Sequence, residues 1–325
     1  MPKRLSRRNL HYSFSSSHLP VLKVDQHEVF EVETVDCFNG QVTPCDPSAE
    51  VPYETLNPVT GPIFVEGAEV GDILAVTLHD IQPEGIGISR FGCSYGQLSK
   101  HVQKSNSLAE NTRFFDFDKK SNMLTMRELQ SSTYNHRKER ITFPASPMLG
   151  VIGVAPSGDE SVSIPTMPAG AHGGNLDDRM TCKDSIVYLR VNKKGAFLSI
   201  GDMHAAMGDG EICGTGVECS GVATLSCRVL KKEETRANTQ NSGKLFESSN
   251  EPIIFPVTET KTHFYTHRVV VENIPKTTEV ACEEAARLLV GQWGFTPEDS
   301  FVFLSVQGNL GCCQCSTNYL CTYMS

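Results

Sequence analysis

The sequence predicts a mainly β protein with a few helices, in which a β-sandwich-like core precedes an α+β C-terminal part. Short apolar or alternating runs recur between residues 20 and 230, and Gly, Pro, Asn and Asp clusters separate them. A clear helical spacing appears only late, over Glu279–Trp293. We therefore predict a β-rich core over residues 1–250, which carries the active-site loops, and an α+β subdomain over residues 251–325 packed on that core.

Composition narrows the class of protein. The 325 residues include 29 basic and 38 acidic side chains, and the net charge of −9 argues against a nucleic-acid partner. No apolar run reaches about 18 residues, so we expect no membrane span. The basic N-terminus precedes a polar stretch, which favours a solvated arm over a secretory signal. The 12 cysteines are too dilute for a disulfide scaffold and predict a reducing, cytoplasmic location.

The first elements are short strands. Residues 20–36 form two alternating runs around Asp25–His27, which predicts a β-hairpin. The nearly continuous apolar run Ile73–Ile81 predicts a strand buried on both faces. The Pro and Gly residues that follow it predict a loop, on which Glu84 is interpreted as a surface acid rather than a catalytic one.

The middle of the chain alternates strands with polar loops. Residues 114–117 and 123–126 flank a polar turn, which predicts a surface hairpin. The Gly-interrupted run 147–156 predicts a strand that other backbone approaches closely, and 157–171 predicts a loop. Three further strands are expected, over residues 186–191, 196–200 and 221–230.

The last elements are mixed. The polar stretch 231–250 predicts a solvated loop, and 253–257 and 264–271 predict strands. Thr278 is a plausible N-cap for the helix Glu279–Trp293. Thr296–Asp299 resembles a short helix start, whereas the run Phe301–Val306 predicts a final core strand.

The densest set of polar side chains lies between residues 201 and 219, directly after an apolar run. It places Asp202, His204, Asp209, Glu211 and Glu218 among several glycines. Residues two apart in an extended chain share a face, and carboxylates this close repel unless a cation or shared protons lie between them. The stretch therefore predicts a metal-dependent active site. Two hairpin turns with solvated acids are the alternative, and His204 is equally consistent with a ligand and with a buried core residue.

Two other segments offer similar donors. In His172-Gly-Gly-Asn175-Leu-Asp177, the glycines allow close approach of backbone to a ligand. A tight turn with Asx capping also explains this segment, and it is the favoured interpretation when the segment is considered by itself. Asp36 ends a predicted strand, where a plain turn is again the favoured interpretation.

Other catalytic chemistries have weaker signals. No Gly-Xaa-Ser-Xaa-Gly string directly follows a predicted strand, and no phosphate-binding glycine loop is present. Cys213 lies near His204 in sequence, but its acidic neighbourhood would raise the pKa of the thiol and blunt it as a nucleophile. The spacing of the Cys312–Cys315 cluster does not match the usual zinc sites and indicates structural or incidental thiols.

Several of these segments match one family. Residues 57–67, 71–76, 148–156, 172–177 and 201–218 strongly resemble the acetamidase/formamidase family in content and order, and residues 36–41 look like its N-terminal acidic motif. The resemblance implies hydrolysis of formamide or acetamide to a carboxylate and ammonia. It also implies a mostly β, sandwich-like fold, a divalent metal for which zinc is the usual suggestion, and homo-oligomers.

The resemblance carries over residue by residue. The expected metal ligands are Asp36, His172, Asp177, Asp202 and His204. The expected catalytic residues are Glu211, Glu218, Asn175 and Asp209. In this scheme Glu211 or Glu218 moves the proton between water and ammonia, and Asn175 holds the oxyanion.

The sequence departs from the family pattern at two methionines. Met203 stands where Gly is usual and Met207 where Gln is usual, so these positions are expected to mark the substrate choice of this chain. The competing hypothesis is a non-catalytic β protein in which the acids bind a structural cation such as calcium.

Overall fold

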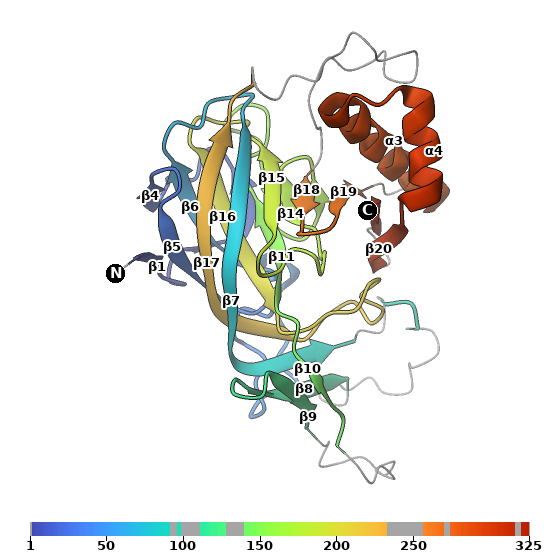
Figure 1. Ribbon diagram of the computed structural model, residues 1–325. Coiled ribbons are helices and arrows are strands. Elements are labelled where there is room, and N and C mark those ends of the chain that lie inside the picture. The colour runs from blue at the N-terminus through green and yellow to red at the C-terminus, as the bar shows by residue number, and fades with distance from the viewer. Residues whose placement is uncertain are drawn as a thin grey trace.

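The fold is dominated by strands. The structure, a computed structural model, describes residues 2–91, 96–98, 111–127, 140–232, 256–269, 274–315 and 320–324. Figure 1 shows the strands gathered into one body, with the helices α3 and α4 (red) at one side of it. The predicted mainly β class, with few helices, is confirmed.

Most strands come from the first 230 residues. The N-terminal elements are β1 Lys3–Leu5, β2 Leu10–His11, β3 Ser13–Ser15, β4 Leu22–Val24, β5 Val29–Thr34, the 3₁₀ turn η1 Tyr53–Thr55, β6 Val59–Val65 and β7 Ile73–Arg90. The central ones are β8 Thr112–Asp118, β9 Met123–Met126, β10 Thr142–Pro144, β11 Met148–Gly153, β12 Ser163–Pro165, β13 Ala169–Gly170, β14 Gly173–Asn175, β15 Ile186–Arg190, β16 Ala196–His204 and β17 Glu218–Leu230. The C-terminal elements are β18 Val257–Glu259, β19 Phe264–Val269, α3 Ile274–Trp293, α4 Pro297–Gln307, β20 Leu310–Cys315 and β21 Leu320–Met324.

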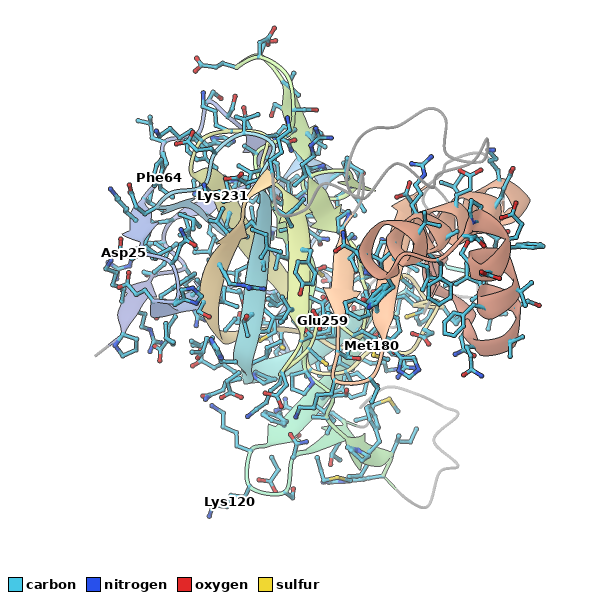
Figure 2. All side chains as sticks on the ribbon, turned by 45° about the horizontal axis from the view of Figure 1, so that its top comes forward. Asp25, Phe64, Lys120, Met180, Lys231 and Glu259 are labelled. Atoms are coloured by element: carbon cyan, nitrogen blue, oxygen red, sulfur yellow. The ribbon has the colours of Figure 1, made fainter. Side chains whose placement is uncertain are left out.

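Two long antiparallel strands form the spine. β7 pairs with β17 from Ile73 opposite Leu230 to Ile88 opposite Glu218. β7 also pairs with β15 and β8, and β17 with β5, so most of the sheet is attached to this pair. One large cluster of buried apolar side chains fills the interior between the strands. In Figure 2, Lys120 marks the turn between β8 and β9, away from the end of the core where Phe64 and Lys231 lie.

Several predicted strands are confirmed and one extends further than expected. The hairpin of β8 and β9 and the strands around residues 186–191, 196–200 and 221–230 are all present. The strand predicted to end at Ile81 continues to Arg90, so the loop placement of Glu84 is wrong. The ladder with β17 explains the difference, because it keeps the polar second half extended through register shifts.

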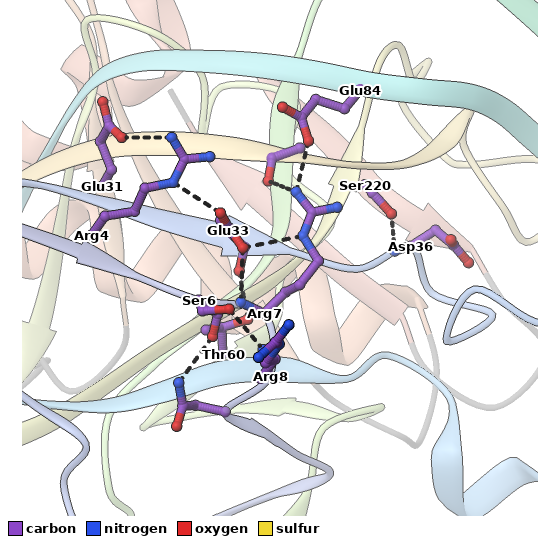
Figure 3. Close-up of polar contacts among 12 residues, drawn as sticks. Arg4, Ser6, Arg7, Arg8, Glu31, Glu33, Asp36, Thr60, Glu84 and Ser220 are labelled. Carbon is purple, nitrogen blue, oxygen red and sulfur yellow. Dashed lines mark hydrogen bonds and ion pairs between the residues drawn. The ribbon is translucent and has the colours of Figure 1, made fainter.

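The N-terminal segment is part of the sheet. The solvated arm predicted there is wrong, because β1 pairs with β5 and two arginines form ion pairs with acids of the core. Figure 3 shows Arg4 with Glu31 and Glu33, and Arg7 with Glu33 and Glu84. Residues 3–5 are therefore held along one edge of β5.

Two other expectations are wrong because of how the strands pair. The turn at residues 25–28 joins β4 to β5, but β4 pairs with β6 and β5 with β17, so 20–36 is not a hairpin. The loop predicted over 157–171 contains the short strands β12 and β13, which pair with β3 and β14. β4, β5 and β12 all have partners that are distant in sequence, so local patterns do not reveal these pairings.

The C-terminal region contains one confirmed and one unexpected helix. α3 includes the predicted helix and begins five residues earlier, at Ile274. The strand predicted over Phe301–Val306 is wrong, since this run lies in α4. Thr296 caps α4 by accepting from the Asp299 amide, and Pro297 begins it, so the cap overrides the β propensity of the run.

Some predictions lie partly outside the described residues. These include the loop over 231–250, most of the strand over 253–257 and the boundary at residue 250, so the division into 1–250 and 251–325 stays a prediction. The described C-terminal elements are attached to the main sheet where β18 pairs with β15. Neither described helix is long and apolar enough to cross a membrane.

Candidate active site

A cluster of buried acids surrounds one histidine in the core. Asp202 and His204 lie at the end of β16, and Glu218 begins β17. Asp177 follows β14, and Glu211 lies in the loop between β16 and β17. All five side chains are at most 7% exposed.

Strand pairing brings these segments together. β16 pairs with β17 so that His204 is opposite Glu218. β11 lies on the other side of β16 and also pairs with β14, which delivers Asp177 to the same place. Residues that are distant in sequence therefore converge, because β11 bridges the two strands that carry them.

Three carboxylates approach the same imidazole nitrogen. His204 Nε2 lies 3.1 Å from Glu218 Oε2, 3.4 Å from Asp202 Oδ2 and 3.9 Å from Asp177 Oδ1. Ligand atoms of Asp177, His204 and Glu211 all lie within 4.8 Å of one another. Four acids and one histidine thus share a small buried volume, where carboxylates repel strongly unless positive charge is present.

The cluster shifts the acidity of its members. Burial opposes a charged imidazole, but the carboxylates of Glu218 and Asp202 raise the pKa of His204 well above its ordinary value. Burial, with the charge of Asp202 adding to it and that of His204 opposing it, raises the pKa of Glu218 to about 7. Burial and the charge of Asp177 raise the pKa of Glu211 well above its ordinary value. A carboxyl group whose pKa lies near neutrality is suited to proton transfer.

Backbone strain is concentrated in this cluster. Asp177, Asp202 and Glu211 have φ values of 43°, 52° and 39°, in the left-handed region that L residues rarely adopt. Such conformations persist where the surroundings enforce them, and they occur disproportionately at functional sites. The fold therefore holds three of the four acids in unfavourable conformations.

Several ligand-type atoms lack ordinary hydrogen bonds. Among the described residues, no group forms a hydrogen bond of normal geometry with either ring nitrogen of His204, with Asp202 Oδ1 or with Glu218 Oε2. These oxygen and nitrogen donors suit a divalent cation such as zinc, and a cation would also remove the repulsion. The residues present thus fit a metal ion.

Two residues that sequence reasoning did not assign also lie here. Cys37 Sγ and ligand atoms of Asp202 and Glu218 lie within 4.8 Å of one another. Asn57 donates from Nδ2 to Asp202 Oδ2 at 3.3 Å and from its backbone N–H to Cys37 O at 2.9 Å. Both residues lie in segments that carried the family resemblance, which was the only signal for them.

Two glycines leave room for these side chains. A Cβ at Gly150 would lie 2.4 Å from Asp202 Oδ2 and 2.6 Å from Asp177 Oδ1. A Cβ at Gly216 would lie 2.7 Å from His204 Nδ1, and the Gly216 amide donates to Glu218 Oε1 at 2.8 Å. The backbone thus forms part of the wall of the site.

Three expected site residues have other surroundings. Asp36 Oδ1 accepts from the amides of Phe38 and Gly40, and the Asp36 amide donates to Ser220 Oγ (Figure 3). Asp209 forms an ion pair with Arg179 at 2.7 Å, and both side chains are at least one third exposed. Neither group of convergent ligand atoms includes these two acids or His172.

His172 is buried in a mostly apolar environment. Its ring meets the edge of Phe14 at a centroid distance of 5.0 Å. Burial lowers the pKa of His172 to about 4, so the ring is neutral at physiological pH. No hydrogen bond reaches its Nε2 from the described part of the chain, and the neutral ring retains the ability to bind an ion.

Asn175 links the site to the C-terminal strand. Its backbone carbonyl accepts from Gln314 Nε2 at 2.9 Å, and its side-chain Oδ1 has no donor among the described residues. Gln314 also forms a parallel bridge with Gly210, next to Glu211. β20 therefore contacts both segments that flank the acids.

The two unusual methionines occupy different places. Met203 is fully buried, and its sulfur packs against Gly221, so it belongs to the core. Met207 lines a cavity of about 400 Å³, together with Phe143, Thr215 and Gly216. Because Gly216 also borders His204, this cavity lies beside the acid cluster.

Comparisons with known proteins point to one family. The family model described as "Acetamidase/Formamidase family" matches residues 4–161 and 159–313. A formamidase from Methylophilus methylotrophus is 28% identical over 256 residues, which cover 66% of this chain and 62% of that protein. The chain thus spans less than two thirds of the length of this curated relative.

Solved structures resemble the whole chain. An acetamidase from Bacillus halodurans has a TM-score of 0.80 at 28% identity and covers 99% of this chain and 96% of its own. A recombinant predicted acetamidase/formamidase from Thermoanaerobacter tengcongensis has a TM-score of 0.82 at 29% identity, with 100% and 95% coverage. The family model spans nearly the entire sequence, and the chain therefore belongs to the acetamidase/formamidase family.

Proposed function

We propose that this protein is a metal-dependent amidohydrolase that converts a short aliphatic amide, formamide or acetamide, to a carboxylate and ammonia. The observation that carries the proposal is the convergence of buried carboxylates on His204 in a member of this family. The formamidase and acetamidase names of its relatives support the substrate class.

The metal would be held by side chains whose buried ligand atoms converge. Asp177, Asp202 and His204 are the proposed ligands, because both carboxylates approach His204 Nε2, and zinc suits these nitrogen and oxygen donors. When bound, the ion supplies a Lewis acid that polarises the amide carbonyl and acidifies water. Asp36 and His172 were also expected ligands, and their different surroundings support secondary roles in shaping the loops.

The protein groups move the proton and orient the amide. Glu218, with its pKa near 7, is proposed to take the proton from water and return it to the leaving nitrogen. Glu211 would hold its proton and donate a hydrogen bond, because its pKa is also raised well above the ordinary value. Asn175 is proposed to bind the amide group of the substrate through its side chain. The ion pair of Asp209 with Arg179 supports a role in holding the loop.

A small amide panel tests the proposal. The purified protein is analysed for metal and assayed for ammonia release from formamide, acetamide and longer amides, with and without a chelator. We expect hydrolysis that the chelator abolishes and that Glu218→Gln reduces by at least about 10²-fold without loss of metal. Stoichiometric metal without ammonia release from any amide would instead support a structural cation.

We further propose that the chain works as a homo-oligomer that associates through α4. Phe301, Val302 and Val306 on this helix are 77%, 61% and 68% exposed, an unusual apolar surface for a monomer. Light scattering should give a multiple of the chain mass, and Phe301→Ser with Val306→Ser should reduce it. Leu19→Ser, at an equally exposed site in the N-terminal segment, should leave it unchanged. A monomeric wild-type protein would contradict the proposal.

A further inference from the structure

A cysteine lies among the acids of the site. Cys37 follows β5 in the loop that begins at Asp36, and it is 5% exposed. Its sulfur and ligand atoms of Asp202 and Glu218 lie mutually within 4.8 Å, which is the separation expected of groups that share an ion. Asp202 Oδ1 and Glu218 Oε2 are buried and lack hydrogen bonds of normal geometry within the described residues.

The surrounding backbone fixes this arrangement. The Asn57 amide donates to Cys37 O, while its side chain donates to Asp202 Oδ2, so one residue ties the cysteine loop to the strand end. Asn57 itself is held at a φ of 47°. Ser220 accepts from the Asp36 amide, which anchors the same loop to β17 two residues after Glu218. Cys37 is therefore positioned by three contacts that all involve site segments.

The neighbouring acid is engaged elsewhere. Asp36 Oδ1 accepts from the amides of Phe38 and Gly40, which uses the carboxylate to shape the turn. The side chain that this loop presents to Asp202 and Glu218 is thus the thiol.

We propose that Cys37 is a metal ligand, which binds a thiophilic divalent ion through its sulfur together with Asp202, beside the proton carrier Glu218. On binding, the S–H bond breaks, the proton passes to solvent and the sulfur lone pair bonds the ion, so no oxidant or reductant is needed. A sulfur donor favours zinc or cobalt over calcium or magnesium. The inference deepens the proposed metal site but does not require amide hydrolysis.

Cobalt reports the sulfur directly. The full chain is depleted of metal and loaded with one equivalent of Co²⁺, and its absorption spectrum is recorded. We expect a sulfur-to-cobalt charge-transfer band in the near ultraviolet, which Cys37→Ser abolishes. Cys219→Ser is the matched control, because Cys219 is also buried beside Glu218 but its sulfur donates to Met203 O at 3.3 Å. A band that persists in Cys37→Ser, or a wild-type spectrum without it, would overturn the proposal.

Two further measurements complete the test, and the first remains decisive if the serine variant does not fold. X-ray absorption of the wild-type zinc protein should show one sulfur neighbour at about 2.3 Å, and a shell of only oxygen and nitrogen would contradict the proposal. Where the variant folds, zinc affinity should fall at least tenfold while calcium affinity changes by less than threefold. An equal loss for both ions would indicate a packing role and overturn the proposal. Because no readout uses the amide reaction, failure of this proposal can be distinguished from failure of the proposed amide hydrolysis.

Discussion

Single residues without side chains define the walls of the site. Gly216 lies against His204 Nδ1 and donates its amide to Glu218, so any substituent on its Cα must displace the histidine. By contrast, a Cβ at Gly208, in the same loop, would meet nothing within 4 Å. The two glycines therefore differ in what they contribute.

Alanine substitutions should separate these two positions. Gly216→Ala should reduce kcat/KM for the best amide by about 10²-fold, because a displacement of about 1 Å at a catalytic group has that effect. Gly208→Ala should remain within about twofold of wild type. Circular dichroism and ammonia release measure fold and rate. Equal rates in both variants would show that His204 tolerates the displacement.

The sequence located the acids but not their partners. The density of polar residues over 201–219 grouped Asp202, His204 and Glu218, and the donors of 172–177 added Asp177. All four converge in the structure. Nothing local distinguishes them from Asp209, whose partner Arg179 is 30 residues away and known only from the fold. Cys37 has no signal beyond the family motif, because a single reduced cysteine ordinarily behaves as a small hydrophobe.

At the scale of elements, helix caps and strand partners determine secondary structure and strand order where intrinsic propensity does not predict them. The run Phe301–Val306 is β-branched and aromatic, yet it is helical because Thr296, Pro297 and two acids begin α4. Strand existence was predictable from period-two patterns, whereas the pairing of β4 with β6 joins Leu22 to Ile63, which no local pattern connects. Local patterns thus identify elements, and tertiary contacts determine their neighbours.

The cap of α4 makes a testable contribution. Thr296→Ala removes the hydroxyl that accepts from the Asp299 amide and should destabilise the helix start by about 1 kcal/mol. Amide hydrogen exchange in the first turn should then accelerate by about fivefold. Thr296→Ser retains the hydroxyl and serves as the control. Unchanged exchange in the alanine variant would mean that packing against α3 alone holds this end.

At the scale of the whole molecule, the buried charges of the site lower the stability of the fold that contains them. The three buried carboxylates near His204 Nε2 repel one another when ionised, so the ion-free fold bears an electrostatic cost that a cation relieves. Any ligand that binds only the folded state also stabilises it by mass action.

Metal removal should therefore lower the stability of the entire fold. At a free metal concentration of 100 times Kd, binding stabilises by about 2.7 kcal/mol, and chelation should lower Tm accordingly. Differential scanning calorimetry before and after metal depletion measures the change, and re-addition of zinc controls for irreversible damage. An identical Tm in both states would argue that the acids hold no ion.

A second prediction concerns acid stability at the far end of the sheet. Asp72 accepts from Lys231 Nζ at 2.8 Å and from the amides of Glu69 and Lys232, and it ties the end of β17 to the start of β7. Burial opposes the charge, but these hydrogen bonds lower the pKa of Asp72 below its ordinary value. Its contribution is therefore complete above the unfolded pKa of about 3.9 and is lost as the pH falls through the folded value.

Asp72→Asn should accordingly lower Tm at neutral pH and have little effect below the folded pKa of Asp72. Thermal unfolding of the variant and the wild type from about pH 7 down to about pH 2.5 measures the difference. A deficit of the same size across this range would show that the charge is not responsible.

The contact between β20 and the site has a consequence for biosynthesis. Gln314 donates to a carbonyl 139 residues earlier and bridges Gly210, so the segment that contacts both stretches flanking the acids is translated long after them. Ribosomes add about 5–20 residues per second, so roughly 5–20 s separate the emergence of Glu218 from that of Gln314. During that interval the nascent chain carries all of its cluster acids but lacks the contacts that β20 makes with the two flanking segments.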